Sequence, residues 1–534
     1  MAFIHIFLLL SATLPNALAF DFHFRFPSIF SKSVVQSHSD PQVPSTTPRI
    51  AIVGAGAGGS SAAFWVSKAK DRFGLNVEID IYERSSYIGG RSTVVYPYND
   101  TSLPEFELGA SIFVEANKNL WRASDEFNLT RRDFQDQNYQ TGIWDGEQVL
   151  VAFSGGWWDT AKLLWRYGFL SPQRTSTVVQ NMIKRFLHLY QPDAPKWDNI
   201  ADLADAFEWT QLINSTTAEF LLSQGVSEKY IHEVVEAATR VNYGQNVDSI
   251  HALEGACSMA ATGATGIAGG NFQIFEAFVN RSGANVFLDT TVKSITPKNG
   301  PSHLWTLKSD RGSVDYQAVV FAAPFHSTGI VVPNTISEQI PPQPYVNLHV
   351  TLLSTTSPTA NPAYFGLPSD AIVPRMLLTT YQGAREGHSK PEFNSMSYHG
   401  EVREGEWAVK IFSDHELSDE WLSDMFLGQV GWVHRKVWNA YPKLPPTTSF
   451  PPVKLDKGLY YVNAFEPFIS TMETETIAAR NAVDLLLNDE FDSSICGRHI
   501  SPPVEVQSDG SQQPFVAPQP SSSTLEDFVL GWDC

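Results

Sequence analysis

Three glycines between an apolar segment and a helical pattern constrain the fold of this chain more than any other feature. The segment RIAIV (49–53) suits a strand buried on both faces, and a helical pattern then runs on to Lys70. Between them lie Gly54, Gly56 and Gly59. In a GxGxxG turn the first glycine allows the tight turn, the second lets the backbone approach a pyrophosphate, and the third lets the helix pack closely. The pattern predicts a dinucleotide-binding βαβ unit, rather than glycines that serve packing alone.

The residues after the second strand favour FAD over NAD. That strand, segment 77–82, leads into Glu83, which is placed to bind the ribose hydroxyls. The stretch ERSSYIGGR then adds Gly90 and Arg91, and FELGAS adds Gly109. This extended pattern resembles that of flavin oxidoreductases related to amine oxidases, in which a second glycine pair and an arginine support the pyrophosphate. We expect FAD without a covalent link, although an ordinary turn would also explain the glycine pair.

The stretch YYVNAFEPFISTMETETIAARNAV gives an independent indication of the same site. Ser470 and Glu473 have the spacing of a capping box, so a helix should begin near Thr471. Its first amides, including that of Met472, could point at the pyrimidine edge of a flavin, where negative charge collects on reduction. Glu466 matches the acid that related enzymes use near the ribityl chain, and we also expect Val292 to contact the cofactor. Taken alone, the stretch would also suit an ordinary capped surface helix.

The order of patterns along the chain predicts an α/β fold of two interleaved domains. The middle of the chain is mostly helical in pattern, strand patterns return after residue 284, and segments between 345 and 413 suggest a second, antiparallel sheet. We therefore expect a Rossmann-like FAD-binding domain, as in amine-oxidase-like two-domain flavoproteins, interleaved with an α+β substrate domain. The expected FAD-binding segments are 49–114, 248–325 and 455–490, and the expected substrate-domain segments are 115–247 and 326–454.

Both ends of the chain have the patterns of segments outside the folded core. A short apolar run followed by Ala17-Leu18-Ala19 predicts a signal peptide over residues 1–19. A flexible lead over 20–48 and a Pro/Ser-rich tail over 491–534 are also expected. No later segment has the length and apolarity needed to span a bilayer, so we expect a mature protein that is soluble or peripheral.

Composition and short motifs indicate the compartment and exclude some partners. The net charge of −20 repels phosphate backbones, so nucleic acid is not an expected partner. Three cysteines are too few and too scattered for a disulfide framework or a zinc site, and no metal is expected. Four glycosylation sequons agree with the signal peptide in predicting the secretory pathway, with a lysosomal, vacuolar or extracellular destination. The sequons lie at Asn99, Asn128, Asn214 and Asn280.

Several stretches together resemble the prenylcysteine oxidase family, also called prenylcysteine lyases. They are RIAIVGAGAGGSSAAFW, RVNYGQNVDSIHALEGACSMA, GGNFQIFEAF and LYYVNAFEPFISTMETETIAA, and RVNYGQ (240–245) is the most distinctive. The similarity runs from about residue 49 to 487. It implies an FAD-dependent thioether oxidase that uses molecular oxygen to cleave farnesylcysteine or geranylgeranylcysteine into a prenyl aldehyde and cysteine, with release of hydrogen peroxide. The Pro/Ser-rich tail and the segment 466–468 depart from the family pattern and leave substrate details open.

The substrate contacts remain open at the level of sequence. Arg240 could hold a substrate carboxylate or a flavin oxygen by a forked pair of hydrogen bonds, and a structural ion pair is the alternative. We name no general base. Two rival functions also stay open: a flavin oxidase of the same fold acting on an amine or another lipid, and a secreted lipid-binding flavoprotein without turnover.

An aromatic cluster in the helical middle has three possible roles. It could line an apolar substrate channel, pack in the core, or touch a membrane with Arg166, Arg174, Lys184 and Arg185 at the headgroups. The sequence does not separate these roles. The cluster comprises Trp157, Trp158, Trp165, Tyr167 and Phe169.

Overall fold

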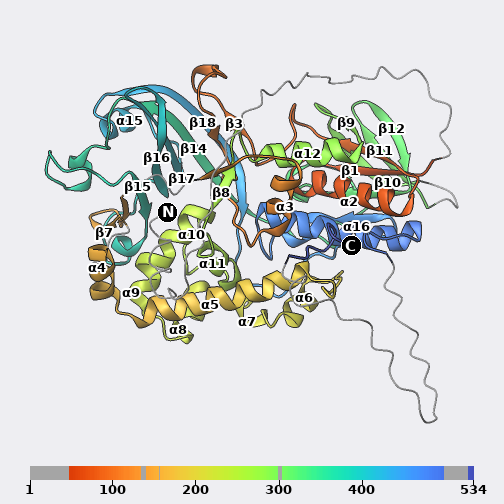
Figure 1. Cartoon of the computed structure of the whole chain (residues 1–534), viewed down its shortest axis with the longest axis horizontal. Coiled ribbons are helices and arrows are strands. Elements are labelled where there is room, and N and C mark those ends of the chain that lie inside the picture. The colour runs from red at the N-terminus through yellow and green to blue at the C-terminus, as the bar shows by residue number, and fades with distance from the viewer. Residues whose placement is uncertain (1–46, 134–139, 155–156, 299–302, 498–526) are drawn as a thin grey trace, which may run out of the picture.

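The structure is a computed structural model that describes residues 47–133, 140–154, 157–298, 303–497 and 527–534. The expected signal peptide and nearly all of the lead lie outside these residues. Figure 1 shows two regions, with a sheet and long helices at the right and a larger sheet above a layer of helices at the left.

The apolar segment that precedes the glycine turn forms a central strand, β1, of a six-stranded sheet. The sheet order is β19-β20-β13-β1-β2-β9, and all neighbours are parallel except the edge strand β19. Because a buried parallel sheet needs cover on both faces, the helices and a smaller sheet pack against it, with α2 between α12 and α16. This confirms the expected α/β class with a Rossmann-like unit. The elements are β1 (Arg49–Val53), β2 (Glu78–Tyr82), β9 (Asn285–Phe287), β13 (Ala318–Phe321), β19 (Lys454–Asp456), β20 (Leu459–Tyr461), α2 (Ala57–Phe73), α12 (Phe272–Ser282) and α16 (Met472–Phe491).

The smaller sheet contains one strand that the sequence analysis did not anticipate. Asp310 and Arg311 form the turn of an antiparallel hairpin, and the second strand of this hairpin, β12, lies against β1. The residues of β12 are mostly polar on their exposed face, which conceals the strand pattern. The three strands are β10 (Val292–Pro297), β11 (Trp305–Ser309) and β12 (Gly312–Tyr316).

A seven-stranded sheet forms the upper left region of Figure 1. Its order is β18-β14-β17-β16-β15-β6-β7. The expected sheet is thus present but not purely antiparallel, because β15 pairs in parallel with β6 from the helical middle of the chain. The strands are β6 (Thr141–Trp144), β7 (Val149–Phe153), β14 (Tyr345–Thr355), β15 (Met376–Thr379), β16 (Ser395–Arg403), β17 (Glu406–Ser413) and β18 (Val430–Pro442).

Helices form the layer beneath this sheet. One stretch, Ile231–Val235, is a π-helical turn between α9 and α10. Two of the remaining helices lie outside this layer, because α3 packs against α12 and α16, and Figure 1 places α15 at the top of the larger sheet. The helices are α3 (Lys118–Glu126), α4 (Trp157–Tyr167), α5 (Leu170–Phe186), α6 (Ile200–Ala206), α7 (Thr210–Ile213), α8 (Thr217–Ser223), α9 (Glu228–Tyr230), α10 (Glu236–Tyr243), α11 (Ala252–Ser258), α13 (Asn334–Ser337), α14 (Gln382–Arg385) and α15 (Asp419–Met425). The short strands are β3 (Val94–Val95), β4 (Phe106–Glu107), β5 (Arg131–Asp133) and β8 (Thr265–Ile267).

The end of the chain is tied back to the first domain by a disulfide that the sequence analysis did not predict. Cys496 and Cys534 are bonded to each other. The Trp532 ring is buried, 4.8 Å from the Phe64 ring of α2, and the Arg72 guanidinium donates to its carbonyl oxygen (2.8 Å). Spacing alone did not reveal the pair because the residues are 38 apart and meet only when the chain end returns to α2.

The helix α16 begins where expected but with a different cap. Its N-cap is Thr471, and the reciprocal capping box joins Thr471 and Thr474 rather than Ser470 and Glu473. Glu473 is fully engaged elsewhere, because its carboxylate accepts from two backbone N–H groups in the first turn of α3 (2.9 Å each). The expected box was wrong by one residue because this acid caps a neighbouring helix.

The surface of the described residues is compatible with glycosylation at the predicted sequons. All four sequon asparagines are exposed. Among the described residues, no helix has the length and apolarity to cross a membrane.

Candidate dinucleotide-binding site

The glycine turn has the backbone geometry of a phosphate-binding loop. Gly54 has a φ of +104°, and a Cβ there would overlap the Ala322 carbonyl oxygen. A Cβ on Gly59 would overlap the Gly54 carbonyl oxygen, so this glycine lets α2 start directly behind the turn. Gly56 differs, because the nearest atom to its Cβ position is Gly90 Cα at 3.7 Å, an ordinary contact. Space beside Gly56 is therefore open for an approaching ligand.

Glu83 and the second glycine pair lie against this turn. The backbone N–H groups of Ala55 and Ser85 each donate to the Glu83 carboxylate at 2.8 Å. Gly56 forms a bridge with Gly89, and Gly90 has a φ of +60° opposite Gly56. The predicted ribose-binding acid and the predicted glycine pair thus meet the same loop.

Arg91 and Glu466 form an ion pair across 375 residues of sequence. The guanidinium Nη2 donates to Glu466 Oε1 at 2.5 Å, and Nη1 donates to the Ala440 carbonyl oxygen at 2.9 Å. The other Glu466 oxygen accepts from the Tyr345 hydroxyl at 2.6 Å. Burial, and then the charge of Glu466, raise the pKa of Tyr345, so its hydroxyl remains a donor. The Glu466 side chain is 2% exposed and is oriented by three donors, Arg91, Tyr345 and the Asn463 side-chain amide (3.2 Å).

The other predicted cofactor residues lie around the same edge of the sheet. A Cβ on Gly109 would overlap the Arg91 carbonyl oxygen and meet the Trp438 ring, so the backbone there is tightly enclosed. Met472 is the first residue of α16, six residues after Glu466. Val292 begins β10, two residues after Thr290, whose N–H donates to the Glu83 carbonyl oxygen (2.8 Å). The structure thus places Gly109 against Arg91 and the start of β10 close to Glu83, and the roles of Gly109, Val292 and Met472 stay predictions.

Buried polar atoms without hydrogen-bond partners line this region. Within the described residues they include Glu475 Oε1, Asn463 Oδ1 and Trp438 Nε1. Asn463 donates its amide to Glu466, and the Trp438 ring faces Gly109. A buried donor or acceptor without a partner is costly, so such a cluster indicates that a polar ligand completes the site. Together with the glycine cradle, it fits a dinucleotide.

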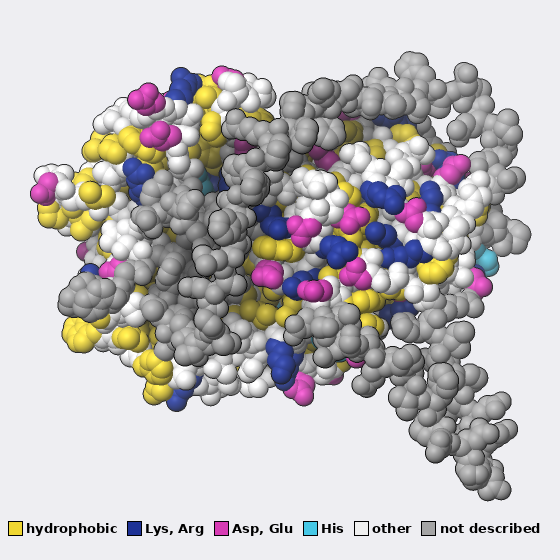
Figure 2. All heavy atoms as spheres, in the orientation of Figure 1, with side chains coloured by type: hydrophobic (Ala, Val, Ile, Leu, Met, Phe, Trp, Pro, Cys, Tyr) yellow, Lys and Arg dark blue, Asp and Glu magenta, His cyan; other side chains and the backbone are white. Residues whose placement is uncertain are grey.

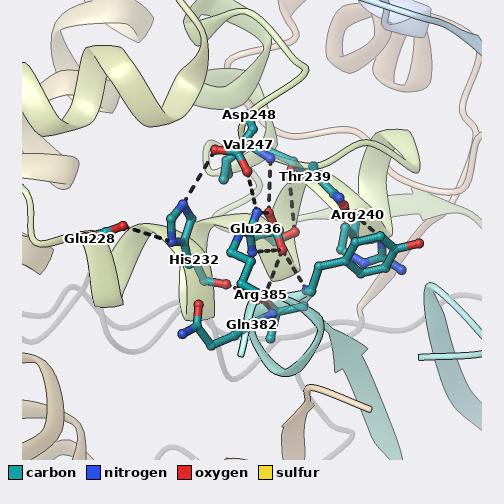
Figure 3. A network of polar contacts seen from close by, with 12 residues as sticks. Glu228, His232, Glu236, Thr239, Arg240, Val247, Asp248, Gln382 and Arg385 are labelled. Atoms are coloured by element: carbon teal, nitrogen blue, oxygen red, sulfur yellow. Dashed lines mark hydrogen bonds and ion pairs between the residues drawn. The ribbon is translucent and has the colours of Figure 1, made fainter. Parts of the chain in front are cut away.

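Arg240 lies in a separate buried network drawn in Figure 3. Its Nε donates to Thr379 Oγ1 (3.0 Å), and its two terminal nitrogens donate to Asn246 and Asn394 side-chain oxygens (2.9 and 2.6 Å). The guanidinium also lies 4.1 Å from the centre of the Tyr381 ring. Each of its nitrogens is thus already used by a neutral oxygen, and a forked pair with a substrate carboxylate would require these contacts to open. The substrate role of Arg240 stays a prediction.

The neighbouring acid of this network, Glu236, is fully buried and strongly held (Figure 3). Arg385 donates to it through both terminal nitrogens, at 2.8 and 2.6 Å, and the Tyr381 N–H donates at 2.7 Å. A cavity of about 510 Å³ lies beside Arg385 and the π-helical turn. Its lining is largely charged, including Arg166, Glu228 and Glu233, so it does not match an apolar chain.

The RVNYGQ motif also reaches the dinucleotide site through β18. The Gln245 side chain donates to the Pro442 carbonyl oxygen (3.1 Å) and accepts from the Leu444 N–H (2.8 Å). The Tyr243 ring packs edge-on against Tyr441, with ring centres 5.6 Å apart. These contacts hold the end of β18, which carries the Ala440 carbonyl that accepts from Arg91.

Comparison with known proteins decides the family. A family model described as prenylcysteine lyase matches residues 152–495, and one described as an NAD(P)-binding Rossmann-like domain matches residues 52–127. A farnesylcysteine lyase of Arabidopsis thaliana is 33% identical over 463 residues, which cover 82% of this chain and 88% of that protein. This chain belongs to the prenylcysteine lyase family.

Further relatives and solved structures agree with this membership. Human prenylcysteine oxidase 1 is 29% identical over 466 residues, covering 81% of this chain and 88% of that protein. A triple mutant of a putrescine oxidase has a TM-score of 0.56 at 13% identity, covering 83% of this chain and 99% of that chain. A fatty acid isomerase from P. acnes has the same TM-score and identity, covering 84% and 99%. These two structures show that this member of the prenylcysteine lyase family shares its fold with proteins outside the family.

Sequence reasoning missed a buried lysine that joins the two regions of this prenylcysteine lyase family member. Lys410 of β17 donates to the Glu107 carbonyl oxygen (2.8 Å) and to Ser111 Oγ (3.0 Å), on either side of Gly109. Burial lowers the pKa of Lys410 to about 8, against the opposing charge of Glu107, and burial raises the pKa of Glu107 to about 7. The signal was present: Lys410 interrupts the apolar residues of EWAVKIFS. It positions the Gly109 segment from the larger sheet.

The aromatic cluster does not act as one unit. Tyr167 is a core residue, with its hydroxyl donating to Glu233 at 2.8 Å. Trp165 is 90% exposed and Phe169 is 47% exposed. The side chains of Trp157 and Trp158 lie outside the described part of the structure. The core interpretation therefore holds for Tyr167 and not for Trp165 or Phe169.

Two buried glutamates predict that the fold is more stable in mild acid than in mild base. Burial raises the pKa of Glu254 to about 8 and that of Glu473 to about 7. An acid whose pKa is higher in the folded state binds more protons there. Its contribution to the free energy of unfolding is therefore full below about pH 4.5, falls as the pH rises from 4.5 to the folded pKa, and is lost above it. Each group contributes up to about 1.4 kcal/mol per pH unit in that window. Burial lowers the pKa of His251 to about 4, which opposes the trend below pH 6.5.

We therefore expect a melting temperature several degrees higher at pH 5.5 than at pH 8. Differential scanning fluorimetry across this range measures it. In the variant Glu254→Gln, residue 254 cannot titrate. Its melting temperature should still fall from pH 5.5 to pH 8, but by less than that of the native protein. Equal melting temperatures at the two pH values would contradict the prediction.

Proposed function

We propose that the protein is an oxidase that holds FAD without a covalent bond and cleaves the thioether of free farnesylcysteine or geranylgeranylcysteine. The products are a prenyl aldehyde, cysteine and hydrogen peroxide, with oxygen and water consumed. The observation that carries the proposal is family membership over most of the chain, together with a complete glycine cradle. The names of its relatives, farnesylcysteine lyase and prenylcysteine oxidase, support the substrate class.

Several residues would hold the cofactor. The N–H groups at the start of α2 and the open face of Gly56 would bind the pyrophosphate, and Glu83 would bind the adenosine ribose. Glu466, oriented by Arg91 and Tyr345, would accept from the ribityl hydroxyls. When bound, FAD supplies a hydride acceptor for the carbon next to sulfur.

The protein itself contributes position and enclosure. The Trp438 ring covers Gly109, and Lys410 fixes the residues on either side of that glycine from the larger sheet. These contacts join the wall of the cofactor site to the sheet on which we expect the substrate to lie. A fixed wall keeps the reacting carbon at one distance from the cofactor and limits the access of water.

The decisive experiment combines flavin content with a substrate panel. Purified protein should be yellow and should release FAD into the supernatant on acid denaturation. Farnesylcysteine should produce peroxide, whereas benzylamine should not. Folded protein that remains colourless after FAD is added would exclude the proposal, and peroxide from benzylamine at an equal rate would favour an amine oxidase of the same fold.

We also propose that the protein enters the secretory pathway and acts in a lysosome, a vacuole or outside the cell. The apolar N-terminal run and the four exposed sequon asparagines support this. Expressed in a eukaryotic cell, the protein should lose mass on endoglycosidase treatment and lack residues 1–19. Unglycosylated protein confined to the cytosol would contradict it.

A peripheral membrane contact is proposed at the junction of α4 and α5. Figure 2 shows apolar side chains at the lower left edge, where Figure 1 places these helices. Four large apolar side chains are exposed there, and burying each in lipid would contribute about 1.5–3 kcal/mol. Arg166 is paired with Glu233, and the net charge is negative, so neutral lipid is the expected surface. The four are Leu164 (39%), Trp165 (90%), Phe169 (47%) and Leu170 (57%).

Sedimentation with phosphatidylcholine vesicles tests this contact. The double variant Trp165→Ser/Phe169→Ser should lose at least about tenfold in vesicle affinity, since two large apolar groups are removed. Phe73→Ser, at an exposed phenylalanine on α2, serves as the matched control and should bind like the native protein. Equal binding of the double variant would contradict the proposal.

A further inference from the structure

Two glutamates in the first turn of α16 are both buried, but their hydrogen bonding differs. The Glu473 carboxylate accepts from two N–H groups of α3 and from the Tyr190 hydroxyl (2.6 Å). Glu475 is 7% exposed, and among the described residues its Oε1 has no hydrogen-bond partner. Because both acids lie on one helix, the difference comes from what each one faces. Glu473 therefore has a structural role, whereas the described residues supply no hydrogen-bond partner for Glu475 Oε1.

Glu475 faces the glycine turn. Its Oε2 lies 2.9 Å from the place that a Cβ on Gly58 would occupy, and Gly58 is the second residue of α2. The carboxyl group is therefore directed at the helix terminus where the N–H groups would bind a pyrophosphate.

The charges around Glu475 do not favour an ionised carboxylate. Glu466 and Tyr461 face it from the segment before α16, and Arg91 faces it from the loop after Gly90. Arg91 is already paired with Glu466 at 2.5 Å. Burial, and then the charge of Glu466, raise the pKa of Glu475 well above its ordinary value, while Arg91 opposes the shift. A bound pyrophosphate would add two more negative charges on the same side.

We propose that Glu475 is a protonated acid that donates a hydrogen bond to an anionic oxygen of the dinucleotide at the glycine turn, an inference that rests on the proposed FAD binding. A neutral carboxylic acid has one O–H donor, and an oxygen of the pyrophosphate would supply the hydrogen-bond partner that this carboxyl group lacks at Oε1. Once ionised, Glu475 would lose the donor and repel the phosphates. FAD affinity should then fall by about tenfold for each pH unit above the point where Glu475 ionises.

The experiment measures FAD affinity as a function of pH rather than activity. Apoprotein is titrated with FAD between pH 5 and 9, and binding is followed by flavin fluorescence. Native protein should lose affinity toward the basic end, while Glu475→Gln, a neutral isostere, should bind with little pH dependence. ADP-ribose, which carries the pyrophosphate without the flavin, should show the same contrast in competition with FAD. Melting curves of both proteins confirm that the variant is folded.

Three outcomes are distinguishable. A flat profile for Glu475→Gln against a falling profile for native protein supports the inference. Parallel profiles for the two proteins overturn it and leave FAD binding intact. Folded native protein that binds no FAD at any pH overturns the proposed function and this inference with it.

Discussion

Replacing Gly56 by valine should abolish FAD binding and leave the fold intact. Gly56 has a φ of −77°, which any residue adopts, and its Cβ position meets only Gly90 Cα at 3.7 Å. No protein atom in the described structure therefore requires glycine here. What requires it is the approach of a pyrophosphate to the backbone, which a branched side chain would block. We expect a loss of at least about 100-fold in affinity, or about 2.7 kcal/mol, in a fluorescence titration of the apoprotein.

The variant Gly59→Val provides the contrast. Its Cβ would overlap the Gly54 carbonyl oxygen, so α2 could not pack behind the turn. Both variants should lose FAD, but only Gly59→Val should also lose several degrees of melting temperature as apoprotein. If Gly56→Val binds FAD within threefold of the native protein, the glycine turn is not the pyrophosphate site.

The second large effect concerns the substrate. Farnesylcysteine should be oxidised at least about 1000-fold more efficiently than S-methylcysteine, measured as kcat/KM from peroxide release. Each methylene-sized group of the prenyl chain contributes up to about 0.8 kcal/mol on burial, and only an allylic carbon loses hydride easily beside sulfur. The same prenyl group on an intact protein should not react, because enclosure of the cysteine end would clash with a continuing chain.

A saturated analogue separates binding from chemistry. Hexahydrofarnesylcysteine keeps the chain length but lacks the allylic double bond, so it should inhibit competitively without releasing peroxide. Equal efficiency for S-methylcysteine and farnesylcysteine would show that the chain is not recognised, and the thioether-lipid assignment would fail.

Much of the cofactor site could be predicted because its residues are encoded locally. Gly54, Gly56 and Gly59 act through backbone geometry within one turn, and Glu83 follows the next strand at a fixed spacing. A buried parallel strand can also be recognised by an unbroken run of apolar residues, as in segment 49–53. These features depend on near neighbours in the chain, so the sequence alone determined the fold class and the dinucleotide cradle.

Contacts between distant segments were decided only by the tertiary structure. Arg91 forms an ion pair with Glu466, which is 375 residues away in the sequence. Cys496 bonds to Cys534 only because the chain end packs on α2. The capping box was misplaced for the same reason, since Glu473 is used by α3 rather than by its own helix.

The difference has one physical cause. Backbone preferences and burial periodicity act over a few residues and are written in order along the chain. The partner of a buried charge depends on where helices and sheets from remote segments come to rest, because a buried polar group must be satisfied by whatever lies beside it. The sequence by itself determined that a dinucleotide cradle forms. Only the tertiary structure decided that Arg91 holds Glu466 and that Lys410 secures the Gly109 segment from the other sheet. It also decided that Glu475 Oε1 has no hydrogen-bond partner within the described part of the chain.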